Sequence, residues 1–192
     1  NTALGDGSLL VLTSGAENVA VGKDALAANT TANNNTAVGT EALKANTTGV
    51  ENTSTGKGSL QANTTASYNT AVGSGALGDT TTGASNTAVG RGALNKNTTA
   101  SNNTAVGQSA LGANTTGDSN TGLGVSALQN NTTGTQNAAV GMNTMRDNTT
   151  GLSNSALGEG AFITNTTGSY NTAIGRLSLF LNTTASNNTA VG

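Results

Sequence analysis

The segment Asn35-Thr36-Ala37-Val38-Gly39 returns as Asn69-Thr70-Ala71-Val72-Gly73 and as Asn103-Thr104-Ala105-Val106-Gly107, each time at a multiple of 17 residues. The same 17-residue unit fills the rest of the chain without insertion or deletion, as eleven full copies and a partial twelfth, Asn188-Thr189-Ala190-Val191-Gly192. A fixed period near 20 residues is typical of repeat proteins, in which each unit buries its apolar side only against its neighbours. We therefore interpret residues 1–192 as a single repeat array and expect it to be a segment of a longer fibre.

One repeat, numbered from its Asn, reads NTAVGxxALxxNTTGxx. Positions 2 to 5 alternate in character and include a β-branched residue, which predicts a short strand. A second short strand is expected around positions 8 and 9, and the Asn-Thr-Thr-Gly run turns the chain back. An obligatory Gly and a Thr-Thr pair in each unit disfavour a helix. The predicted fold is all-β: a parallel β-solenoid, or β-roll, with one coil per repeat.

Two columns are apolar in nearly every copy and are predicted to form the core. Position 4 is apolar in eleven of twelve copies, Thr55 being the exception, and position 9 is apolar in all eleven. The predicted core residues are Val38, Leu43, Val72, Leu77, Val89, Leu94, Val106 and Leu111.

Stacked coils also place identical polar residues one above another. An Asn at position 1 can pass amide hydrogen bonds from coil to coil, and a Gly at position 5 allows a tight turn or a close backbone approach. Loss of one buried partner costs roughly 1 to 3 kcal/mol, which explains why the column does not vary. The predicted structural ladder comprises Asn18, Asn35, Asn69, Asn86, Asn103, Gly22, Gly39, Gly73, Gly90 and Gly107.

Composition argues against several classes of function. The chain has no Cys and no His, and its nine acids and seven bases are scattered over positions 6, 7, 10, 11, 16 and 17. No nucleophile has a base at a recurring spacing, so we expect neither an enzyme nor a cofactor or metal site. The bases form no stripe for nucleic acid, and the apolar runs are too short to span a membrane.

The repeated turn matches the Asn-x-Ser/Thr pattern of N-glycosylation acceptors. Turn chemistry alone requires Asn, Thr and Gly and accounts for the pattern, while glycosylation along one edge of the rod is the alternative. The candidate acceptors are Asn29, Asn46, Asn63, Asn97, Asn114, Asn131, Asn148, Asn165 and Asn182.

Columns of Thr at positions 2, 13 and 14 raise the further alternative of an ice-binding solenoid. A flat ice-binding face needs two outward Thr separated by one inward residue. Positions 13 and 14 are adjacent, and their side chains would diverge in a strand. The sequence therefore disfavours this function without excluding it.

The units quoted first resemble the head repeats of trimeric autotransporter adhesins and related trimeric bacterial surface or phage tail fibres. The resemblance covers the whole chain, although the adhesin unit is shorter and the additional residues here fall in the Asn-Thr-Thr-Gly turn. It implies a left-handed parallel β-roll in which three chains pack small residues together. The matching column is Ala3, Ala20, Ala37, Ala71, Ala88 and Ala105.

Periodicity and resemblance together predict a structural segment of an extracellular or cell-surface fibre, serving as a stalk or an adhesive head. The expected partners are further copies of the chain, in a homotrimer or an end-to-end polymer, and a surface glycan or protein receptor contacted by the variable corner positions. A self-polymerising filament subunit and a free-standing solenoid remain alternatives.

Overall fold

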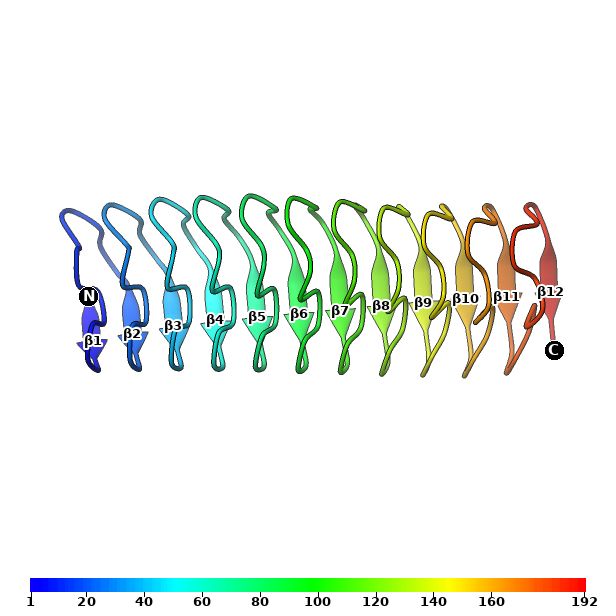
Figure 1. Cartoon of the computed structure of the whole chain (residues 1–192), viewed down its shortest axis with the longest axis horizontal. Coiled ribbons are helices and arrows are strands. Elements are labelled where there is room, and N and C mark those ends of the chain that lie inside the picture. Colours follow the sequence, from blue (N-terminus) through cyan, green and yellow to red (C-terminus); the bar gives the residue numbers. More distant parts are fainter.

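In the computed structural model, which describes residues 1–192, the chain winds into a parallel β-solenoid with one short strand per coil (Figure 1). All strands lie in one sheet, and each pairs only with the strands before and after it in sequence. This confirms the predicted fold class. The strands are β1 Thr2–Leu4, β2 Val19–Val21, β3 Thr36–Val38, β4 Thr53–Thr55, β5 Thr70–Val72, β6 Thr87–Val89, β7 Thr104–Val106, β8 Thr121–Leu123, β9 Ala138–Val140, β10 Ser155–Leu157, β11 Thr172–Ile174 and β12 Thr189–Val191.

Successive coils pair with an offset of one repeat. Val72 in β5 lies opposite Val89 in β6, and the backbone outside the strands follows the same rule, since the amide of Leu94 donates to the carbonyl of Ala110 at 3.0 Å. Each coil is thus hydrogen-bonded along much of its length to its neighbours. The chain forms no helix, so it has none that could cross a membrane.

The interior is narrow and filled by small residues and one larger apolar residue per coil. Ala at positions 3 and 8 and Leu at position 9 are buried in most coils. Leu43, Leu77, Leu94 and Leu111 have no exposed surface, as predicted. At roughly 4.8 Å per coil these side chains stack into one continuous core along a rod of roughly 50 Å.

The prediction that position 4 belongs to the core is wrong. Val38, Val72, Val89 and Val106 point outward and keep 36 to 39% of their surface exposed. Side chains alternate between the two faces of a strand, so a strand of three residues that turns position 3 inward must turn positions 2 and 4 outward. The interior has room for Ala at position 3, and the bulkier Val lies on the surface.

The role implied for the alanine column is also wrong. Ala20, Ala37, Ala71, Ala88 and Ala105 have no exposed surface and pack in the interior of their own chain. Only at the two ends of the array is this column open: Ala3 is exposed and Ala190 is partly exposed. The small residues therefore fill a narrow coil and cannot contact a partner chain.

The second strand expected at positions 8 and 9 is absent. Position 9 adopts a left-handed conformation in each full coil, with φ of 50° at Leu94 and 54° at Phe162, and position 17 does the same, with φ of 61° at Asn102. A β-branched residue is strongly disfavoured in that region. Position 9 accordingly holds Leu, Met or Phe and never Val, Ile or Thr. The absence of β-branched residues from position 9 was visible in the sequence, and it indicates a corner of the coil in place of a strand.

The fourth coil places two polar residues in the core, one on each side of the interior. In the fourth coil, position 3 is Ser54 and position 8 is Ser59, and both are fully buried. The Ser54 hydroxyl donates to the carbonyl of Ser59 at 2.9 Å, and the two hydroxyl oxygens are also in hydrogen-bond contact. The Ser59 hydroxyl in turn donates to the carbonyl of Gly56 at 2.9 Å, so neither buried hydroxyl is left without a partner.

Candidate interaction surface

The position-1 asparagines form the predicted ladder. Asn86 is fully buried, and its Nδ2 donates to Oδ1 of Asn69 at 3.2 Å and to the carbonyl of Ala100 at 2.9 Å. Its Oδ1 accepts the backbone amide of Asn103 at 3.0 Å. An Asn side chain is needed because a single group must both donate and accept.

The position-12 asparagines form a second ladder on the inside of the turn. Asn131 donates through Nδ2 to Oδ1 of Asn114 and to the carbonyl of Gly134, at 2.8 and 2.9 Å. Eight of the nine candidate glycosylation residues have no exposed surface, and Asn182, near the C-terminal end, is half-buried. The nitrogen that would carry the glycan already donates inside the coil, so the folded array has no room for a sugar at the buried positions.

Thr80 interrupts this second ladder. Nδ2 of Asn46 donates to Asn29, and Nδ2 of Asn63 donates to Asn46 at 2.8 Å. The next coil carries Thr80 at this position and has no amide to continue the series. As a result Oδ1 of Asn63 is buried without a hydrogen-bond partner.

Replacing Thr80 by Asn is expected to stabilise the fold. The introduced amide can donate to Oδ1 of Asn63 and accept from Asn97, which removes an unsatisfied buried acceptor worth about 1 to 3 kcal/mol. The gain is measured as an increase in the free energy of unfolding in urea. Thr80→Val is the control, because it keeps the shape of threonine but adds no donor. An equal increase in the free energy of unfolding in both variants, or no increase in Thr80→Asn, would contradict the view that the unpartnered Oδ1 of Asn63 destabilises the fold.

The outward face of the sheet carries a row of exposed apolar side chains. Position 4 presents a row of Val, Leu and Ile along the rod, interrupted at Thr55. Position 2 presents a parallel row that is Thr in nine of twelve strands. No charged residue occurs in either row. We call these two rows the sheet face.

The sheet face is hollowed where position 2 becomes smaller. Ala138 and Ser155 replace Thr in β9 and β10 and leave a shallow groove of about 240 Å³ beside Val140, Leu157 and Ile174. Leu157 and Ile174 keep 52 and 41% of their surface exposed. A row of exposed apolar side chains of this length is unusual for a surface that faces only water.

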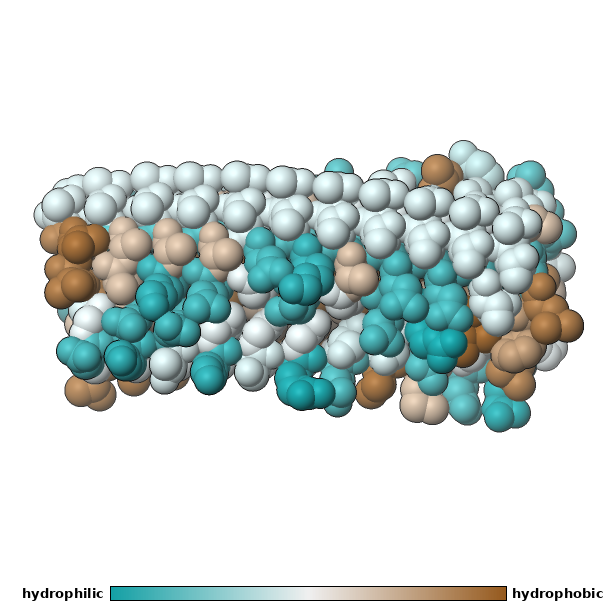
Figure 2. Space-filling model, in the orientation of Figure 1, coloured by the Kyte–Doolittle hydropathy of each residue, from teal (hydrophilic) through white to brown (hydrophobic).

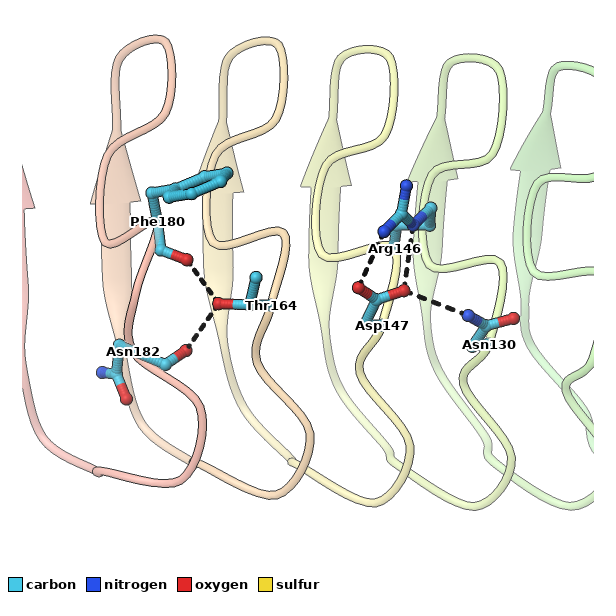
Figure 3. A network of polar contacts seen from close by, with 6 residues as sticks. All are labelled: Asn130, Arg146, Asp147, Thr164, Phe180 and Asn182. Atoms are coloured by element: carbon cyan, nitrogen blue, oxygen red, sulfur yellow. Dashed lines mark hydrogen bonds and ion pairs between the residues drawn. The ribbon is translucent and has the colours of Figure 1, made fainter.

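Charged groups lie at the coil corners, as predicted. Arg146 donates two hydrogen bonds to Asp147, both at 2.9 Å, and Asn130 of the preceding coil adds a third at 3.1 Å (Figure 3). The hydrogen bonds from Arg146 stabilise the carboxylate and lower the pKa of Asp147. Such a contribution is present above the ordinary pKa of Asp and is lost as pH falls through the lowered pKa, and for a pair this exposed it is small.

A side-chain hydroxyl also links neighbouring coils close to the C-terminal end. Thr164 donates to the backbone carbonyls of Phe180 and Asn182 in the following coil (Figure 3). No group of three Asp and Glu residues is close enough to hold a metal ion. The structure therefore brings the predicted ladder residues together and leaves the acids dispersed.

Comparison with known proteins identifies no relative: no protein-family model, curated protein or solved structure matches the chain.

Proposed function

We propose that the chain is a structural segment of an extracellular fibre and that its sheet face packs against other copies of the same chain. The observation that supports this most directly is the uncharged row of Val, Leu and Ile that the fold leaves on its surface. A self-associating surface typically has an apolar centre with a polar rim. Here the apolar row is flanked by the Thr row, and the charged positions lie at the corners beyond.

The free energy gained per coil, compared with the free-energy cost of association, explains why such an interface needs many coils. Complete burial of a Val side chain is worth roughly 1.5 to 3 kcal/mol, and about a third of each position-4 Val is still exposed. Each coil can therefore add roughly 0.5 to 1 kcal/mol on association, against a cost of roughly 4 to 15 kcal/mol for bringing the chains together. A few coils cannot hold two chains, whereas a long row of apolar residues can.

A homotrimer is the assembly that the family resemblance favours. In the trimer proposed here, three sheet faces meet at the fibre axis in place of the buried alanine column, and the charged corners face outward. The corner positions 6, 7, 10, 11, 16 and 17 vary from coil to coil. They are the surface on which a receptor or a surface glycan would bind if the segment is an adhesive head.

The proposal is tested by the reactivity of a single introduced thiol, since the chain has no Cys. Val89→Cys places the thiol on the sheet face, and Ala113→Cys places it at position 11 on another side of the coil. In an isolated chain residue 89 is the more exposed of the two. If the sheet face is buried between copies, a maleimide is expected to react much more slowly with V89C than with A113C.

Chemical denaturation provides the internal control, because both thiols should then react at the same rate. Reaction of V89C at least as fast as A113C under native conditions would contradict burial of the sheet face. The measurement is independent of the number of chains and of their relative direction.

A further inference from the structure

Position 14 forms an exposed row that the fold itself does not explain. Its residue is Thr in ten coils and Ser in the first. Each of these residues is exposed. We call this row the threonine ridge: Ser14, Thr31, Thr48, Thr65, Thr82, Thr99, Thr116, Thr133, Thr150, Thr167 and Thr184.

The Thr residues at position 13 have a structural role, because their hydroxyls form hydrogen bonds between coils. At position 13 the Thr98 hydroxyl donates to the carbonyl of Thr115 at 3.1 Å, and the same bond recurs along the array. The hydroxyls of the threonine ridge make no such bond. Other exposed columns change freely, as at position 17, which includes Ser85, Asn102 and Tyr170. An exposed column that stays constant without an internal contact indicates a requirement from outside the chain.

The shape of the turn removes the sequence-based objection to a two-row Thr surface. Positions 13 and 14 lie in a bend and not in a strand, so their side chains need not point to opposite faces. Thr98 is half-buried and Thr99 is exposed. Figure 2 shows an unbroken pale band, the colour of residues such as Thr and Ser, along the edge formed by the upper turns of Figure 1.

The ligand must match a long row of identical, uncharged hydroxyl groups. Phosphate or nucleic acid would require cations, and a pyranose ring is usually held by an aromatic side chain; the ridge contains neither. A single small molecule would meet no more than two or three hydroxyls. A periodic solid can contact every coil at once, provided that its repeat is close to the coil spacing of about 4.8 Å.

We propose that the threonine ridge binds the surface of ice. Water oxygens along the basal plane of hexagonal ice repeat at a distance close to the coil spacing, so successive hydroxyls and methyl groups can meet equivalent lattice positions. The ridge lies on the edge of the coil and not on the sheet face. Ice binding is therefore independent of the proposed self-association.

The test measures thermal hysteresis, the gap between melting and freezing temperature, together with enrichment of the protein in a slowly growing ice hemisphere. The ridge variant carries Thr82→Lys, Thr99→Lys and Thr116→Lys. The control variant carries Ser74→Lys, Gln108→Lys and Val125→Lys, at the exposed position 6 where Lys23 and Lys57 occur naturally. Thermal melting monitored by circular dichroism establishes that both variants keep the fold.

The wild-type chain and the control variant are expected to enter ice and to show hysteresis, and the ridge variant is expected to lose most of both. Thr82→Val, Thr99→Val and Thr116→Val separate the contribution of the hydroxyls from that of side-chain shape. Exclusion of the wild-type chain from ice would overturn the proposal. So would equal activity of the folded Lys ridge variant, or binding to an insoluble polysaccharide in place of ice.

Discussion

Replacing Gly90 by alanine is expected to lower the free energy of unfolding by more than about 3 kcal/mol, because steric overlap adds to backbone strain. Gly90 has φ of 136°, outside the range that residues with a Cβ normally adopt. A Cβ built there would lie 2.5 Å from the carbonyl oxygen of Gly107 in the next coil. The corner cannot move away easily, because the amide of Gly90 donates to the carbonyl of Val72 at 2.8 Å in the previous coil. Urea denaturation followed by circular dichroism measures the loss.

Gly92→Asn is the matched control in the same coil. Gly92 also has a positive φ, of 66°, but a Cβ built there would have no atom within 4 Å. Asn143 occupies the equivalent position in a later coil with φ of 56°. We therefore expect a change within about 1 kcal/mol, as for an exposed residue at a compatible backbone position. Similar losses for the two variants would show that the close approach at position 5 is not what fixes the coil spacing.

Replacing Asn86 by aspartate is expected to cost about 3 to 5 kcal/mol at neutral pH, the usual penalty for an unpaired buried charge. The carboxylate would have no hydrogen to donate to Oδ1 of Asn69 or to the carbonyl of Ala100, both of which accept from Asn86. It would also place a negative charge beside those two oxygens. Thermal melting and urea denaturation measure the change.

The pH dependence of N86D distinguishes charge from shape. Burial raises the pKa of a carboxyl group, so the introduced acid is neutral in the folded state at a pH where it is ionised in the unfolded chain. The folded state then binds the additional proton, and the destabilisation grows as pH rises above about 3.9 and diminishes on acidification. Asn102→Asp makes the same chemical change at an exposed position and should cost little at any pH. A loss in N86D that does not shrink in acid would point to altered packing instead.

The solenoid could be predicted from the repeat, because each 17-residue period forms one coil that is hydrogen-bonded to the next. The Asn and Gly of the NTAVG unit were interpreted correctly: Asn103 continues the amide ladder and Gly107 receives the close approach of Gly90. These roles follow from the chemistry of one residue and from its constancy along the array.

The two faces of the strand were assigned the wrong way round because alternation alone does not say which face is inside. Hydrophobicity favoured Val89 over Ala88 for the core, yet the coil is so narrow that Ala88 lies inside. The size of the residues at positions 3 and 4 distinguishes the inner face of the strand from the outer face. Position 3 is always small, whereas position 4 varies among Val, Leu, Ile and Thr, as expected for a row that is not tightly enclosed.

The sheet face could not have been predicted while position 4 was assigned to the core. The threonine ridge was recognised as a column, but its exposure depends on the bend at positions 13 and 14. The fold of a turn is set by the coil around it and not by the alternation rule for strands.

The mass of the native particle in solution, measured by multi-angle light scattering, tests self-association through the sheet face most directly. The account predicts a stable particle of more than one chain, at three times the 18.6 kDa of the chain for the proposed trimer. An open-ended series of masses would indicate a self-polymerising filament in place of a closed bundle. A stable particle of 18.6 kDa, unchanged as the protein is concentrated, would contradict the account.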